Sequence, residues 1–72
     1  MTLKYRDVEA VLRADGWYPL PRTGTSHRHF KHPSKPGRVT LAGEPGEDID
    51  PKSLGSVIRQ AQLERKDFLG KK

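Results

Sequence analysis

The sequence predicts an α+β fold with the element order α-β-β-β-α, in which two helices cover one face of a three-stranded antiparallel sheet. Apolar residues recur at helical spacing near both ends of the chain, and three short segments between them have the length of strands. These segments are joined by short turns, which favours an antiparallel meander. Two amphipathic helices are enough to cover one face of such a sheet, so the other face is predicted to be open to solvent or to a ligand.

Two long helices are predicted, over residues 3–15 and in the segment that follows Asp50. The apolar faces of these helices consist of Tyr5, Val8, Val11 and Leu12 in the first and Leu54, Val57, Ile58 and Ala61 in the second. Gly16 is placed to end the first helix, because the left-handed C′ position favours glycine. Asp50 suits the N-cap of the second helix and Pro51 its first position. A short helical turn that packs Phe68 and Leu69 back onto the core is predicted near the end of the sequence.

The three predicted strands are residues 17–22, 26–32 and 38–42. Pro19 and Pro21 lack a backbone donor, so the first of these segments is either an edge strand or a short extended lead-in. Alternation along the second strand sorts its side chains into two sets, because successive residues point to opposite faces. Phe30 is predicted to face the helices, together with Ser26, Arg28 and His32. The open face then receives His27, His29 and Lys31.

Length and composition limit the classes of protein that fit. With 72 residues the chain forms one domain, residues 1–72. No apolar run exceeds three residues, which excludes a membrane span and a signal-peptide core, and the expected location is the cytoplasm. The chain has no cysteine, so disulfide scaffolds, thiolate zinc sites and thiol nucleophiles are excluded.

Positive charge is concentrated in one part of the chain. The net charge is +5, and the sequence pI is near 9.9. Residues 22–38 contain five basic side chains and all three histidines, with no carboxylate. A cationic cluster of this kind favours a polyanion such as nucleic acid. A basic face kept for solubility is the alternative.

Several kinds of site fit the sequence poorly. His27 and His29 share one side of a strand, but no third ligand completes a metal site nearby. Ser26 and His27 are adjacent in a strand and therefore point to opposite faces, which disfavours a serine hydrolase. No glycine-rich segment has the spacing of a phosphate-binding loop. We therefore expect neither a metal nor a cofactor.

Ribonuclease chemistry fits the cluster better. Cleavage of RNA without a metal requires that the 2′-hydroxyl lose a proton, that cations balance the phosphate charge, and that the leaving 5′-oxygen gain a proton. An imidazole with an ordinary pKa of about 6.5 can act as acid or base near neutral pH, and lysine and arginine bind phosphate. A surface histidine without a catalytic role is the alternative reading of His27.

Ser26 and His27 followed by Phe30 form a motif, and further matching segments are Asp15-Gly16-Trp17, Val39-Thr40-Leu41 and Leu54-Gly55-Ser56-Val57-Ile58. This pattern resembles the HicA toxins, which are small messenger-RNA interferases of bacterial toxin–antitoxin modules. The chain departs from the family pattern in having Thr25 instead of a glycine and Gln62 at the end of the second helix. Its loop at residues 43–50 is acidic where the family has a proline, a histidine and a basic residue.

The resemblance implies a fold of the double-stranded-RNA-binding type, with His27 as the catalytic histidine of a metal-independent endoribonuclease. It also implies a HicB-type antitoxin that covers the active face, with the toxin a monomer when free and part of a hetero-oligomer when neutralised. The residues expected to bind messenger RNA are Arg22, Ser26, Arg28, His29, Lys31 and Lys35. A non-catalytic RNA-binding module of the same fold and a protein-docking domain with a basic face are the alternatives.

Overall fold

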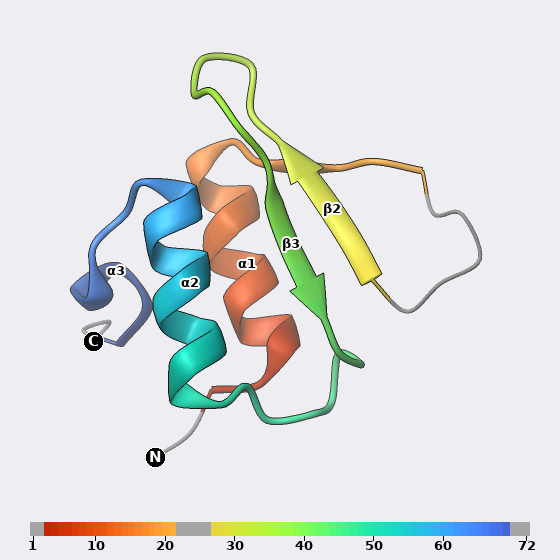
Figure 1. Cartoon of the computed structure of the whole chain (residues 1–72), viewed down its shortest axis with the longest axis vertical. Helices are drawn as coiled ribbons and strands as arrows, with labels where there is room; N and C mark the ends of the chain where they lie inside the picture. Colours follow the sequence, from red (N-terminus) through yellow and green to blue (C-terminus); the bar gives the residue numbers. More distant parts are fainter. Residues whose placement is uncertain (1–2, 22–26, 70–72) are drawn as a thin grey trace.

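The computed structural model describes residues 3–21 and 27–69 and contains the predicted elements in the predicted order (Figure 1). Their bounds are α1 Tyr5–Asp15, β1 Tyr18–Pro19, β2 His27–Lys31, β3 Val39–Ala42, α2 Pro51–Ala61 and α3 Arg65–Leu69. The three strands form one sheet in the order β1-β2-β3, and both pairings are antiparallel. The α+β prediction is therefore confirmed. Within the described part of the chain, no helix is long and apolar enough to cross a membrane.

Helix α1 begins at Tyr5, two residues later than predicted, because the acidic loop caps its first turn. The backbone N–H of Tyr5 donates to the carbonyl of Glu47 and that of Arg6 to the carbonyl of Pro45, each at 3.0 Å. These two donors would otherwise lack partners at the start of the helix. The helix ends as predicted at Gly16, whose φ of 110° lies in the left-handed region.

Helix α2 has the predicted N-cap. The Asp50 carboxylate accepts hydrogen bonds from the Ser53 backbone N–H at 3.1 Å and the Ser53 hydroxyl at 2.7 Å. These bonds lower the pKa of Asp50, since they favour its ionised form. The helix ends at Gln62, which adopts a left-handed φ of 57° although it is not a glycine. Its side-chain amide donates to the carbonyl of Pro36 at 3.4 Å.

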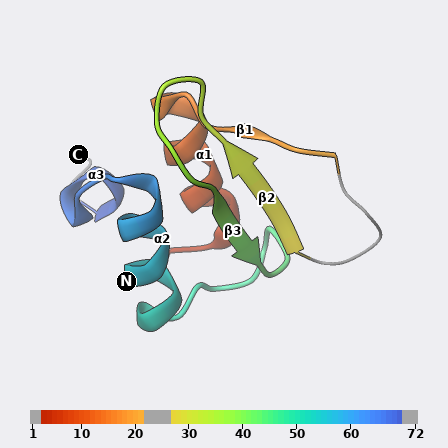
Figure 2. The same cartoon turned by 45° about the horizontal axis from the view of Figure 1, so that its top comes forward.

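Both long helices lie on the same side of the sheet, so the core is a single layer between the sheet and the helices (Figure 2). The sheet contributes Phe30, Val39 and Leu41, which are completely buried. The core residues from the rest of the chain are Tyr5, Val8, Leu12, Trp17, Ile49, Leu54, Val57, Ile58, Ala61 and Phe68. The predicted packing of Phe68 is thus confirmed, whereas the side chain of Leu69 lies outside the described part of the structure.

The turn between β2 and β3 is fixed to the ends of both long helices. The Lys35 ammonium donates to the Asp15 carboxylate at 2.6 Å and to the carbonyl of Ala61 at 3.1 Å. His32 Nε2 donates to the backbone carbonyl of Asp15 at 2.7 Å, and His32 Nδ1 accepts from the backbone N–H of Ser34 at 3.0 Å. One end of the sheet is therefore held by the C-termini of α1 and α2.

Candidate functional site

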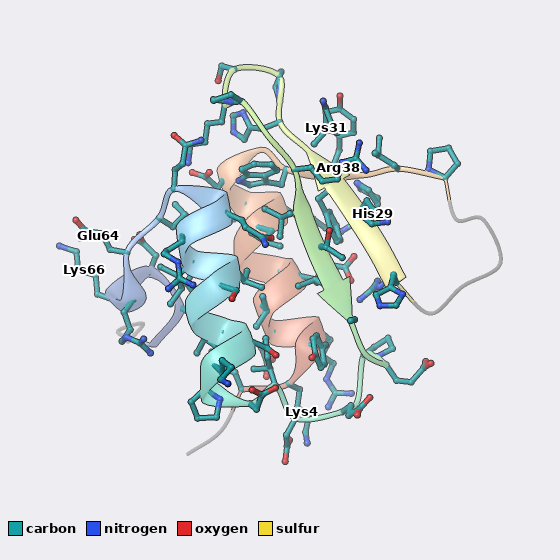
Figure 3. All side chains as sticks on the ribbon, viewed as in Figure 1. Lys4, His29, Lys31, Arg38, Glu64 and Lys66 are labelled. Atoms are coloured by element: carbon teal, nitrogen blue, oxygen red, sulfur yellow. The ribbon has the colours of Figure 1, made fainter. Side chains whose placement is uncertain are left out.

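The side of the sheet opposite the helices carries the histidines of β2. His27 is exposed, His29 and Lys31 are partly exposed, and Phe30 between them is completely buried. His29 and Lys31 both project from β2 on the side away from the helices in Figure 3. The predicted alternation is therefore confirmed. We call this side the open face, and its residues are Tyr18, His27, His29, Lys31, Arg38 and Thr40.

Arg28 lies on the opposite side of β2, toward α1. Its Nη1 donates to the Glu9 carboxylate at 2.5 Å, and each of these side chains is 15% exposed. Arg13 reaches the second oxygen of the same carboxylate at 2.8 Å. Partial burial alone would raise the pKa of Glu9, but the hydrogen bonds and charges of Arg13 and Arg28 outweigh it, so its pKa lies below the ordinary value. Arg28 thus joins the sheet to α1.

Lys35 is also separated from the open face, because its ammonium is bound at the ends of α1 and α2. The charge pattern of the sequence could not separate Arg28 and Lys35 from Lys31, since it shows how many cations are clustered but not which carboxylate each one meets. Arg22 and Ser26, which are also expected to bind RNA, lie outside the described residues. Of the predicted site residues, the structure brings His27, His29 and Lys31 together.

His29 is held by the neighbouring strand. Its Nδ1 lies 3.0 Å from the hydroxyl oxygen of Thr40, which is its partner across the β2–β3 ladder. The backbone N–H of Thr40 in turn donates to the side-chain amide oxygen of Gln60 on α2 at 3.2 Å. The ring orientation of His29 therefore depends on β3 and, through Thr40, on α2.

Tyr18 and Arg38 extend the open face beyond the predicted residues. Tyr18 is 47% exposed and pairs across the sheet with Lys31, so both side chains lie on one face. Arg38 is exposed and immediately precedes Val39, which pairs with Phe30, so it lies at the end of β3 nearest Lys31. An exposed aromatic ring beside cations suits a nucleobase that stacks next to a phosphate. The buried Trp17 is the sequence signal that could have revealed Tyr18, because neighbours in a strand point to opposite faces.

A pocket lies between β3 and α2, and Thr40 of the open face is one of its lining residues. Its lining residues are Tyr5, Thr40, Ala42, Ser53, Ser56 and Val57. No three histidine, aspartate or glutamate side chains of residues 3–21 and 27–69 come together in a way that could hold a metal ion. The open face offers proton-transfer groups and cations for a ligand.

Comparison with protein families gives a match that covers most of the chain. Residues 5–63 match the family described as the HicA toxin of bacterial toxin–antitoxin systems. The chain belongs to the HicA toxin family. The comparison with curated proteins gives no match. Membership of the family makes the chain the toxin of a toxin–antitoxin module, with an antitoxin as its partner.

In this HicA-family toxin, the matched range contains the whole open face and both long helices. Imidazole groups can accept or donate protons near neutral pH, while ammonium and guanidinium groups bind phosphate. His27 and Lys31 come from the same strand, so the distance between them is set by regular strand geometry. The open face therefore combines acid–base groups and phosphate-binding groups on one rigid support.

Proposed function

We propose that this toxin is a metal-independent endoribonuclease that cleaves messenger RNA with His27 and thereby inhibits translation. The observation that carries the proposal is the arrangement of β2, which presents His27, His29 and Lys31 on one face while the intervening Arg28 is bound to Glu9 on α1. Family membership supports the same function.

In the proposed reaction, His27 accepts the proton of a ribose 2′-hydroxyl, and the 2′-oxygen attacks the adjacent phosphorus. The bond from phosphorus to the 5′-oxygen then breaks, and that oxygen receives a proton. The products are a 2′,3′-cyclic phosphate and a free 5′-hydroxyl. General acid–base catalysis of this kind typically contributes about 10²- to 10⁴-fold in rate. Lys31 binds phosphate, and Tyr18 and Arg38 continue the RNA surface along the same face.

The exposure of His27 supports a catalytic role over a structural one. His27 is at the first position of β2, opposite Ala42, and is not part of the core. Its replacement should therefore change stability little. His32 is the contrasting case, because its side chain is only 8% exposed and packs edge-on against Trp17 with ring centres 5.2 Å apart.

The test compares the native toxin with His27→Ala on messenger RNA in excess EDTA. We expect the native toxin to cleave and His27→Ala to lose cleavage, with an unchanged melting temperature and retained RNA binding. Cleavage by His27→Ala at the native rate would overturn the proposal, and so would native activity that EDTA abolishes and added zinc or magnesium restores. Binding without cleavage by the native toxin would favour the non-catalytic RNA-binding module.

The proposed antitoxin is a HicB-type protein that occludes the open face directly. A cationic surface that carries His27 is neutralised most simply by Asp and Glu side chains that also exclude RNA. Amide exchange should then show protection of residues 27–31 in the complex. Protection confined to residues 44–61, with residues 27–31 left open, would refute direct occlusion.

A further inference from the structure

Cleavage by the proposed route needs a group that protonates the leaving 5′-oxygen, and we infer that His29 is this acid. The inference rests on the proposed function and names the second proton-transfer group of the same site. Its basis is the position of His29 on the open face and the hydrogen bond of its Nδ1 to Thr40.

The spacing along β2 favours His29 over Lys31 for this role. A strand rises about 3.4 Å per residue, so the Cα atoms of His27 and His29 are about 7 Å apart, whereas those of His27 and Lys31 are about 14 Å apart. An acid and a base that act on one phosphodiester must both come within about 3 Å of oxygens around the same phosphorus. His29 is the nearer partner, and Lys31 is placed to bind a neighbouring phosphate.

The bond to Thr40 determines which proton His29 gives up. When the imidazole is protonated, both ring nitrogens carry a proton. Nδ1–H then donates to the Thr40 hydroxyl oxygen, 3.0 Å away. Within residues 3–21 and 27–69, Nε2 has no hydrogen-bond partner, so its proton is the one available to RNA. Transfer from Nε2 leaves a neutral ring that keeps its bond to Thr40.

Thr40 is a positioning residue in this arrangement. Its own backbone is fixed by the Gln60 side chain on α2, which accepts the Thr40 N–H at 3.2 Å. The hydroxyl is thus held on a strand that packs against a helix. A preorganised ring loses less conformational entropy when substrate binds than a ring that must first be oriented.

The protons balance across the two histidines. His27 gains the proton of the 2′-hydroxyl while His29 loses its Nε2 proton to the 5′-oxygen. One phosphorus–oxygen bond forms and one breaks, and the net charge of the pair is unchanged. Proton exchange with water afterwards reverses both transfers and completes the cycle.

The experiment uses two RNA oligonucleotides of the same sequence, one with an ordinary phosphodiester at a bond the toxin cleaves and one with sulfur in place of the bridging 5′-oxygen. The 5′-thiolate leaves without a proton, so the sulfur substrate does not need the acid. We expect His29→Ala to lower the cleavage rate at least about 10²-fold on the oxygen substrate and less than about tenfold on the sulfur substrate. His27→Ala should lose activity on both.

Thr40→Val removes the hydroxyl but keeps the branched shape. Thr40→Val should slow cleavage of the oxygen substrate more than cleavage of the sulfur substrate. Thr40→Ser keeps a hydroxyl and should cleave the oxygen substrate at close to the native rate. The inference would be overturned if His29→Ala lowered the cleavage rate equally on both substrates, or on neither. Melting temperatures of the variants confirm that each one is folded. Native-rate cleavage of both substrates by His27→Ala would instead show that the proposed function itself is wrong.

Discussion

Replacement of Glu9 by glutamine should destabilise the toxin more than replacement of its partner Arg28 by methionine. The Glu9 carboxylate binds both Arg28 and Arg13. Loss of Arg28 therefore leaves Glu9 with one cation. Loss of Glu9 leaves Arg28 without a carboxylate partner within the described residues, where its Nη2 already has no hydrogen-bond partner.

The expected cost follows from the exposure of the pair. Breaking a fully buried pair costs about 3–5 kcal/mol, and an exposed pair contributes about 0–1 kcal/mol. At 15% exposure for each side chain, Glu9→Gln should cost about 2 kcal/mol, because a hydrogen bond to a charged group contributes about 1.5–3 kcal/mol. Arg28→Met should cost about 1 kcal/mol, since its stem still packs. For a domain of this size, about 2 kcal/mol corresponds to about 8–16 °C in Tm.

The assay is urea unfolding of the two single variants and the double variant. We expect the double variant to resemble Arg28→Met, because methionine removes the charge that Glu9 compensates. The pKa of Glu9 is lowered in the folded state, so its contribution is present above the ordinary value of 4.5 and is lost as the pH falls through the folded-state pKa. Glu9→Gln should remove this part of the acid sensitivity.

An RNA-binding measurement separates the structural role of Arg28 from the expectation that it contacts RNA. Arg28→Met should leave the salt dependence of RNA affinity unchanged. The opposite result is that Arg28→Met lowers the slope of RNA affinity against salt concentration by about one, with a free energy of unfolding within about 0.5 kcal/mol of the native value. That result would show that Arg28 binds RNA and that its bond to Glu9 on α1 is not its main role.

Lys31→Ala should weaken RNA binding and lower the salt slope by roughly one, whereas Lys66→Ala on α3 serves as a matched control without effect. Tyr18→Ala should weaken binding of single-stranded RNA by about 1–3 kcal/mol in a filter-binding assay, and Tyr18→Phe should retain most of the affinity because stacking needs only the ring. Gly16→Ala should lower Tm, because a Cβ at this left-handed position would lie 2.7 Å from His32 Nε2. Gln62→Gly should raise Tm in the same thermal scan, since glycine adopts the left-handed conformation without strain; an unchanged or lower Tm would contradict this.

The features that the sequence predicts well are those that depend on neighbouring residues. Asp50 and Pro51 define the start of α2 because capping involves only the first turn, and Gly16 defines the end of α1 for the same reason. The sides on which His27 and Phe30 lie follow from the two-residue period of a strand. The order of the elements and the face of the sheet on which His27, His29 and Lys31 lie could therefore be predicted without knowing any contact between distant residues.

The partners of the cations could not be predicted in this way. Lys35 and Arg28 have the same charge as Lys31 and lie within four residues of it, yet they bind Asp15 and Glu9 on α1. These pairs depend on where α1 crosses the sheet, which no local pattern encodes. The bond between His29 and Thr40 likewise depends on the register of two strands.

The position of Lys35 has an electrostatic consequence for the whole molecule. Helices α1 and α2 run in the same direction, as Figure 1 shows, so their macrodipoles add, with roughly half a negative charge at each C-terminus. The Lys35 ammonium meets both of these ends, while the carbonyls of Pro45 and Glu47 in an acidic loop meet the positive N-terminus of α1. Both ends of the helical layer are thus compensated within the chain. The positive potential that remains uncompensated is therefore that of the open face. A polyanion attracted to the toxin is directed to the open face rather than to the ends of the helices.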